Sequence, residues 1–207
     1  MFEGTAVPQG IGPAIVGAEI CIYDHPELPC DTTDSQGQFT VFPPANAETA
    51  LTLAANGFGG VLVALVTSDQ PMYGWVIGMP PLARITSFYE TAGTPYPDPG
   101  KGFVQIYAMT GNGQQGLAGV SMTLAPAGGV GPLYADAAGD PDGTLQATTT
   151  AGFARYGALP LGTLEVGLLP DTLACQPNFG GWVSPNLNAV RAPVAEGFET
   201  HLGFYCQ

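Results

Sequence analysis

Residues 17–39 read GAEICIYDHPELPCDTTDSQGQF, and this stretch predicts the fold more clearly than any other part of the chain. Ala18, Ile20 and Ile22 alternate with more polar neighbours, with the period of two that is typical of a strand with one buried face. The tetrapeptide DSQG then predicts a turn, because Asp bonds its own backbone and Gly tolerates positive φ. Apolar alternation resumes at Phe39. The stretch therefore predicts two strands joined by a polar loop with a cysteine on each side.

The composition favours an all-β protein. The chain has 207 residues, and its 30 Gly and 20 Pro interrupt the apolar spacing of three and four that a long helix requires. So much Gly and Pro is also typical of disorder, but 45% hydrophobic residues, ten Phe and eight Tyr can build a core. We therefore expect a folded chain made of β-sandwich domains.

Charge is sparse and almost entirely acidic. The chain carries 17 acidic residues and a net charge of -13, and its four basic residues are scattered at Arg84, Lys101, Arg155 and Arg191. Nucleic acids and anionic lipids are bound by clustered Lys and Arg, so neither is an expected partner. The longest apolar run, Val61 to Val66, is far shorter than the roughly 20 residues of a membrane helix. A surface so poor in charge favours association with a protein surface, with copies of itself or with neutral carbohydrate.

The cysteines suggest an exported protein. The first ten residues, MFEGTAVPQG, have neither the basic residues nor the apolar region of a signal peptide, so we expect that any export signal is not present in this chain. Four cysteines allow three pairings, and proximity favours Cys21 with Cys30 and Cys175 with Cys206. Four buried free thiols in a cytoplasmic protein are the alternative. We expect an extracellular or cell-surface location.

Two halves of the chain follow one plan. Residues 91–102 read TAGTPYPDPGKG and have the composition of a linker. GPAIVGAEICI in the first half compares with GQQGLAGVSMTL in the second, and TTDSQGQFTVFPP with TTTAGFARYGALP. We therefore expect a β-sandwich at 1–91, a linker at 92–102 and a second, diverged sandwich at 103–207, with a long insertion loop from Ala125 to Asp142.

The first half resembles the carboxypeptidase regulatory-like domain, a family with a transthyretin-like or prealbumin-like sandwich. The matching positions are Gly17, Ala18, Glu19, Ile20, Thr32, Thr33, Asp34, Gly37, Phe39, Pro43, Pro44, Gly57 and Phe58. The second half matches weakly, because Ala154 stands where the family has an aromatic residue. The resemblance implies a non-catalytic accessory or structural module of secreted and surface proteins, with no active-site residues to carry over. We expect a non-enzymatic structural or interaction module, and as alternatives a self-assembling subunit of an extracellular filament or surface layer, or a carbohydrate-binding module.

Enzymatic and metal sites have weak support in the sequence. No G-x-S-x-G motif occurs, and the two histidines, His25 and His201, lie in different halves. Asp136, Asp140 and Asp142 in YADAAGDPDG offer a weak calcium candidate, although the EF-hand spacing is absent and a solvated acidic loop is the alternative. No other cofactor is expected.

Two pairs of aromatic residues are candidates for stacking on sugars. Tyr73 and Trp75 lie in one predicted strand, and Phe179 and Trp182 flank a pair of glycines. Flat aromatic faces suit sugar rings when they are exposed, but core packing is the usual role of Trp in a small sandwich. The sequence leaves the ligand open.

Overall fold

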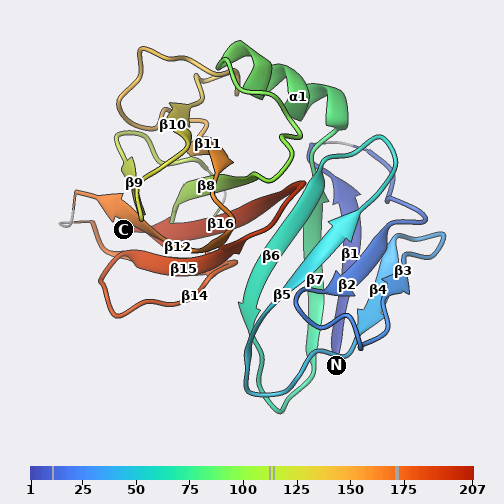
Figure 1. Cartoon of the computed structure of the whole chain (residues 1–207). Helices are drawn as coiled ribbons and strands as arrows, with labels where there is room; N and C mark the ends of the chain where they lie inside the picture. The colour runs from blue at the N-terminus through green and yellow to red at the C-terminus, as the bar shows by residue number, and fades with distance from the viewer. Residues whose placement is uncertain (11, 112, 114, 171–172) are drawn as a thin grey trace. The chain divides into compact units, whose positions relative to one another are not determined.

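The computed structural model describes residues 1–10, 12–111, 113, 115–170 and 173–207 (Figure 1). These residues form β-strands and one short helix, so the all-β prediction is confirmed. The chain divides into two compact units, Met1–Ile85 and Thr86–Gln207. The helix is ten residues long. Among the described residues, no helix has the length and apolarity needed to cross a membrane.

The first unit consists of two sheets. Its strands are β1 (Phe2–Pro8), β2 (Glu19–Ile22), β3 (Asp31–Thr32), β4 (Gln38–Val41), β5 (Glu48–Ala54), β6 (Gly60–Val66) and β7 (Met72–Met79). One sheet has the order β4-β1-β7, in which β1 is antiparallel to β4 and parallel to β7. The other has the order β6-β5-β2-β3 and is antiparallel. The opening stretch of the sequence thus supplies strands to both sheets.

The core of the first unit contains inward side chains from both of its sheets. The rings of Phe2 and Phe39 stack with centroids 6.1 Å apart, and Trp75 tilts against Phe2 at 5.4 Å. Alternating positions of the strands complete the cluster: Ile20, Ile22, Val41, Leu51, Leu53, Val61, Val63 and Ile77. The period-two pattern read from residues 17–39 therefore does point one face into a core.

The second unit also consists of two sheets, together with most of the helix. Its elements are β8 (Gly102–Thr110), β9 (Ser121–Ala125), β10 (Val130–Tyr134), β11 (Phe153–Leu159), β12 (Gly162–Leu169), β13 (Cys175–Phe179), β14 (Trp182–Val183), β15 (Ala189–Val194), β16 (Phe198–Cys206) and the last residues of α1 (Leu82–Thr91). One sheet has the order β10-β11-β8-β16, with β13 paired to β16, and the other has the order β14-β15-β12-β9. β8 is antiparallel to β11 and parallel to β16.

The two units share a strand order. β11-β8-β16 has the same order and the same directions as β4-β1-β7, and β15-β12-β9 matches β6-β5-β2. The second unit adds β10 and β13 at the ends of one sheet and β14 at the end of the other. Equivalent strands can therefore be compared residue by residue.

Three segments differ from the sequence expectation. Residues 2–8, which precede the first strand expected from the sequence, form strand β1. The expected insertion loop between Ala125 and Asp142 contains β10, which pairs with β11. Residues 82–91 form a helix, because Ile85, Phe88 and Tyr89 recur at helical spacing and are buried. The first compact unit ends at Ile85, so the expected linker at 92–102 falls within the second unit.

The segment 92–102 packs against its own unit. The amide of Thr94 donates to the carbonyl of Tyr89 at 3.0 Å, and the ring of Tyr96 stacks on that of Tyr89 at 5.6 Å. Tyr96 also meets the edge of Phe103 at 4.7 Å. Tyr96 therefore anchors this Pro- and Gly-rich segment by packing on Tyr89 and Phe103.

Candidate functional site

The Thr-Asp-x-x-Gly part of the opening stretch forms the turn from β3 of one sheet to β4 of the other. The hydroxyl of Thr33 accepts a hydrogen bond from the amide of Ala18 at 2.8 Å and donates one to the carbonyl of Ile15 at 2.8 Å. The carboxylate of Asp34 accepts bonds from the amides of Gln36 at 2.8 Å and Gln38 at 2.9 Å. Thr33 satisfies buried backbone groups and Asp34 holds the exposed turn that follows, and both are structural roles.

The second unit repeats this arrangement. The hydroxyl of Thr148 accepts a bond from the amide of Val120 at 3.0 Å and donates one to the carbonyl of Leu117 at 2.6 Å. Thr149 takes the place of Asp34, since its hydroxyl accepts a bond from the amide of Ala151, two residues later, at 3.2 Å. Thr33 and Asp34 of the first unit therefore correspond to Thr148 and Thr149 of the second, one residue out of step with an alignment of the two Thr-Thr pairs.

A glycine ends the turn in each unit, for two reasons. Gly37 has φ 74° and Gly152 has φ 71°, in the left-handed region that disfavours side chains. A Cβ on Gly37 would lie 2.8 Å from the carbonyl oxygen of Ala6, and one on Gly152 would lie 2.6 Å from that of Ala108. Neither turn has room for a side chain in place of its glycine.

Both predicted disulfides form, one in each unit. Cys21 is joined to Cys30 across the loop after β2, and Cys175 to Cys206 between the paired strands β13 and β16. Among the described residues, Glu19, Cys21 and Cys30 form the one close group of metal-ligand types, but the two sulfurs are already bonded to each other. The loop that this disulfide closes is therefore a constrained tip and not a metal site. In it, the ring of His25 contacts Glu27 at 2.9 Å, which lowers the pKa of that exposed carboxyl.

A buried cluster of charged and polar residues lies on the α1 side of the β11-β8-β16 sheet. Glu199 is at its centre, with one carboxylate oxygen 3.1 Å from Nε of Arg155 and accepting a bond from the Tyr89 hydroxyl at 2.8 Å. The other oxygen lies 2.9 Å from Nε2 of His201. Arg155 also donates to Gln105 at 3.2 Å. Cross-strand pairing of β11, β8 and β16 aligns Arg155, Gln105 and His201 in one row.

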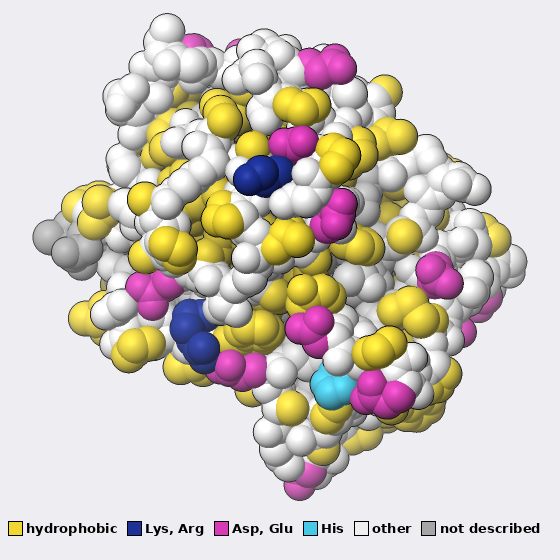
Figure 2. Space-filling model, viewed as in Figure 1, with side chains coloured by type: hydrophobic (Ala, Val, Ile, Leu, Met, Phe, Trp, Pro, Cys, Tyr) yellow, Lys and Arg dark blue, Asp and Glu magenta, His cyan; other side chains and the backbone are white. Residues whose placement is uncertain are grey.

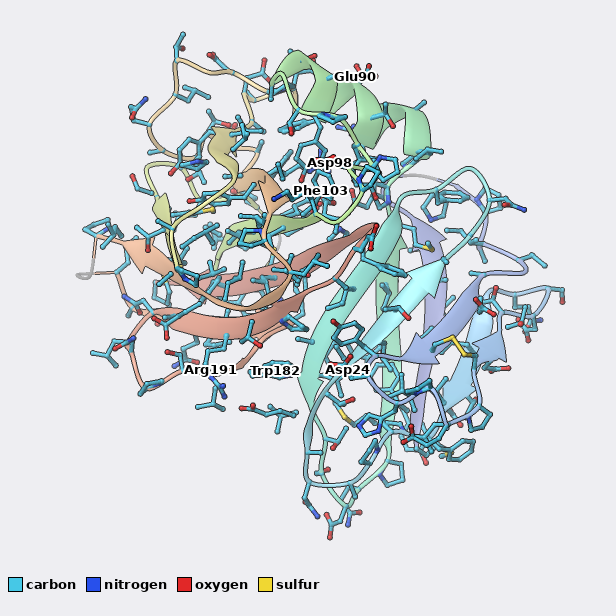
Figure 3. The ribbon with its side chains drawn as sticks, in the orientation of Figure 1. Asp24, Glu90, Asp98, Phe103, Trp182 and Arg191 are labelled. Carbon is cyan, nitrogen blue, oxygen red and sulfur yellow. A yellow bond between two sulfur atoms is a disulfide. The ribbon has the colours of Figure 1, made fainter. Side chains whose placement is uncertain are left out.

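Aromatic rings seal this cluster from solvent. The guanidinium of Arg155 lies 4.5 Å from the ring centroid of Phe88, and Tyr89 packs on Phe103 at 4.8 Å. Figure 3 labels Phe103 on β8, below the helix. Glu199, Arg155 and His201 are only 0%, 3% and 4% exposed. A substrate therefore has no access to these groups in this conformation.

Electrostatic interactions keep Glu199 and Arg155 charged. Burial by itself raises the pKa of Glu199, but the charge of Arg155 and the contacts with His201 and Tyr89 outweigh it, so that pKa lies below its ordinary value. Burial, helped by the charge of Glu199, raises the pKa of Tyr89 well above its usual value. Burial lowers the pKa of Arg155, but the charge of Glu199 outweighs this and the pKa is raised. The arrangement suits an internal ion pair that fixes α1 to the sheet, because each charged group has a partner.

Sequence reasoning missed this cluster, although a signal was present. Glu199 and His201 are two residues apart in the strand FETHLGFYC, so they share one face. Charged residues at alternate positions of an otherwise apolar strand indicate a solvated face or a covered polar one. The helix that covers this face was not predicted, so the second possibility was not visible.

Two of the three calcium candidates, Asp136 and Asp142, cap turns, and the three are not gathered into a site. Asp136 accepts bonds from the amides of Ala138 and Asp140 at 2.8 and 3.0 Å. Asp142 accepts bonds from the amide and the hydroxyl of Thr144, which lower the pKa of its carboxyl. Within the described part of the chain, the carboxylates of Asp136, Asp140 and Asp142 do not form a close group of metal ligands. The geometry therefore matches the alternative, an acidic loop held by its own turns.

The aromatic candidates do not form a shared platform. Trp75 faces the core and contacts Phe2, whereas Tyr73 is 58% exposed on the same strand. The ring of Phe179 packs on Tyr107 at 5.9 Å. Trp182 is half-buried on β14, next to Arg191 on β15 (Figure 3). Neither pair offers two adjacent flat faces to a sugar ring.

Charge is as sparse on the surface as the composition suggests. Figure 2 shows one face on which acidic side chains lie singly among apolar and neutral groups. Several large apolar side chains are exposed: Val16, Phe42, Tyr73, Val76, Val183 and Leu187. Such a surface offers few charged contacts and favours apolar ones.

Comparison with known proteins gives distant structural matches. No family model matches the chain, and no similar curated protein sequence was found. Among solved structures, the chain is similar to the Bacillus anthracis TIE protein, with 14% identity and a TM-score of 0.31, covering 100% of this chain and 33% of that one. It is also similar to GBS52, the minor pilin of Streptococcus agalactiae, with 11% identity, a TM-score of 0.35 and coverage of 99% and 94%. The shaft pilin SpaA of Lactobacillus rhamnosus GG gives 8% identity, a TM-score of 0.27 and coverage of 100% and 96%. The chain thus spans a third of the TIE protein, and similarity this low does not assign a function.

Proposed function

We propose that the chain is a non-enzymatic structural or interaction module of the extracellular or cell-surface space, built from two tandem copies of one β-sandwich. The observation that carries the proposal is the presence of one disulfide in each compact unit. Disulfides persist in oxidising compartments and are common in small exported domains with limited cores. The extracellular location follows from this chemistry.

The shared strand order supports the tandem arrangement. Thr33 and Thr148 make the same two backbone bonds, and Gly37 and Gly152 end the same turn. A turn with these residues also supports the proposed kinship of the first unit with carboxypeptidase regulatory-like domains. The same scaffold occurs twice, and its buried cluster of charged residues is closed to solvent. These two features suit a module that binds through its surface better than an enzyme.

Thiol trapping in intact cells tests this proposal. Cells that produce the chain are treated with an alkylating agent before lysis, and the peptides are mapped without reduction. We expect the Cys21–Cys30 and Cys175–Cys206 pairs to be intact and the protein to react with a surface-restricted amine label through its half-buried lysine, Lys101, or its amino terminus. Recovery of alkylated cysteines from protein that the surface label does not reach would contradict the proposal.

A self-assembling subunit remains the second candidate function. One observation favours it: the exposed apolar side chains include Tyr73 and Val76, both on an edge strand of the first unit.

A further inference from the structure

The outer edge of β7 is long and uncharged. Within the described part of the chain, β7 pairs with β1 alone and ends the β4-β1-β7 sheet. Its eight residues, MYGWVIGM, include no charged residue and no proline. Natural proteins protect edge strands of this kind with Lys, Pro or a covering segment, because free backbone groups pair with other strands. An edge that lacks charge and proline is therefore suited to strand pairing.

The side chains at this edge are suited to contact as well. Gly74 has φ 73°, and the register with β1 shifts beside it, which forms a bulge. Tyr73 and Val76 are 58% and 67% exposed, whereas Trp75 faces the core. An exposed aromatic and an exposed β-branched residue thus lie three positions apart on one strand. Such residues stabilise cross-strand pairs.

The second unit shows how the fold covers the equivalent edge. β16 corresponds to β7, and β13 pairs with it in the antiparallel direction. Phe179 of β13 lies against Gly203, where an added Cβ would collide with its ring. Val76 occupies the position of Gly203, because it pairs with Thr5 as Gly203 pairs with Tyr107. The scaffold therefore accepts an antiparallel strand here, and the described residues of the first unit supply none.

The distribution of charge indicates which partner can pair with β7. With a net charge of -13, two copies of the chain repel each other over most approaches. On the strands of the β4-β1-β7 sheet, the described residues include one acidic side chain, Glu3, and no basic one. The sheet edge at β7 is thus a place where two copies can meet without opposing acidic groups. A basic partner would find little here to bind.

We propose that β7 pairs in the antiparallel direction with β7 of a second copy, around a two-fold axis, so that two three-stranded sheets form one continuous sheet. In the register that places Tyr73 opposite Val76 of the second copy, the aromatic–β-branched contact occurs twice, as a self-complementary interface requires. This proposal rests on the proposed function, of which it deepens the self-assembly branch.

The substitution Val76→Lys tests the interface. It places a charge on the edge strand, opposite Tyr73 of the second copy, where the cost of desolvating the charge opposes pairing. Val16→Lys is the matched control, because Val16 is 62% exposed in the same unit but lies outside β7. Sedimentation velocity and light scattering over a concentration series measure the mass of each full-length, oxidised protein, and circular dichroism melts verify that both variants fold.

We expect the wild type and Val16→Lys to reach twice the monomer mass at high concentration and Val76→Lys to remain a monomer. At low concentration, where all three proteins are monomers, their melting temperatures should agree. Added salt should strengthen the wild-type dimer, since it screens the repulsion between acidic copies. A wild type that stays monomeric at every concentration, or a Val76→Lys variant that dimerises as the wild type does, would overturn the proposal. Either result leaves the surface location intact, whereas reduced cysteines in thiol trapping would overturn the location and leave the dimer standing.

Discussion

At the scale of single residues, the buried Glu199 is the group on which the packing of the second unit depends most. Its carboxylate is in contact with Arg155, His201 and Tyr89, and it is fully buried. Removing one partner from a buried ion pair leaves the other charge without compensation, which costs more than the pair contributes relative to apolar residues. Glu199 and Arg155 should therefore tolerate substitution poorly.

Glu199→Gln should lower the free energy of unfolding by about 3–5 kcal/mol at neutral pH, because Arg155 stays buried without its counter-charge. The lowered pKa of Glu199 means that its stabilising effect is present above the pKa of the unfolded carboxyl and is lost as pH falls through the folded pKa. The wild type should therefore lose more stability than Glu199→Gln on acidification, so the gap between them should narrow. Urea denaturation at a series of pH values measures both effects.

Two variants keep this prediction interpretable. Glu90→Gln alters an exposed acid on α1 and should change stability by less than about 0.5 kcal/mol. Tyr89→Phe removes one of the contacts that lower the pKa of Glu199 and retains the charges, so it should cost about 1–3 kcal/mol and weaken the pH dependence without abolishing it. A gap between wild type and Glu199→Gln that stays constant or widens in acid would show that the carboxylate is not stabilised by its neighbours.

At the scale of elements, equivalent turns should be equally important in the two units. Thr33→Val and Thr148→Val each remove a hydroxyl that bonds one amide and one carbonyl, and both side chains are 4% exposed. Each substitution keeps the shape and leaves buried backbone groups unsatisfied, so each should cost about 1–3 kcal/mol. Thr123→Val, at an exposed position of β9, is the control and should have little effect. A negligible cost at Thr148 alone would argue against a shared plan.

The repeat could be predicted at turns and not in the core. Turns need particular backbone geometries, so their threonines and glycines recur in the sequence, whereas core positions need only a filled volume. Gly4 faces Phe39 across β1 and β4, and Ile106 faces Ala154 at the equivalent place across β8 and β11. A small and a large residue have changed sides, which is why Ala154 looked like a departure from the pattern. The sum of the volumes is kept while the sequence similarity is lost.

The strands were more predictable than the elements around them. Alternation identified the strands at Glu19–Ile22 and Gln38–Val41, because one face of each is buried in the core. The helix at 82–91 was missed, since it lies between two prolines and a Gly-rich segment that dominate the local composition. The sealed cluster at Glu199 requires that helix, so no strand pattern could have predicted its burial. Both disulfides were predicted correctly, because in each case the two cysteines lie close together in the sequence.

At the scale of the whole molecule, each compact unit contains one disulfide and one tryptophan. Cys21–Cys30 and Trp75 belong to the first unit, and Cys175–Cys206 and Trp182 to the second. A tryptophan reports unfolding of its own surroundings, so each unit has an internal probe. This distribution allows the independence of the two units to be measured in the intact chain.

The double variant Cys21→Ser/Cys30→Ser should destabilise the first unit alone. Opening this loop returns conformational entropy to the unfolded chain, so we expect a loss of about 3 kcal/mol in that unit. In a Trp182→Phe background, the fluorescence of Trp75 should show the denaturant midpoint falling. In a Trp75→Phe background, the midpoint reported by Trp182 should not move, and Cys175→Ser/Cys206→Ser should give the reverse pattern with a loss of about 4 kcal/mol. Equal shifts at both tryptophans would mean that the units unfold as one cooperative body, and that a tandem of self-sufficient sandwiches is the wrong description of this chain.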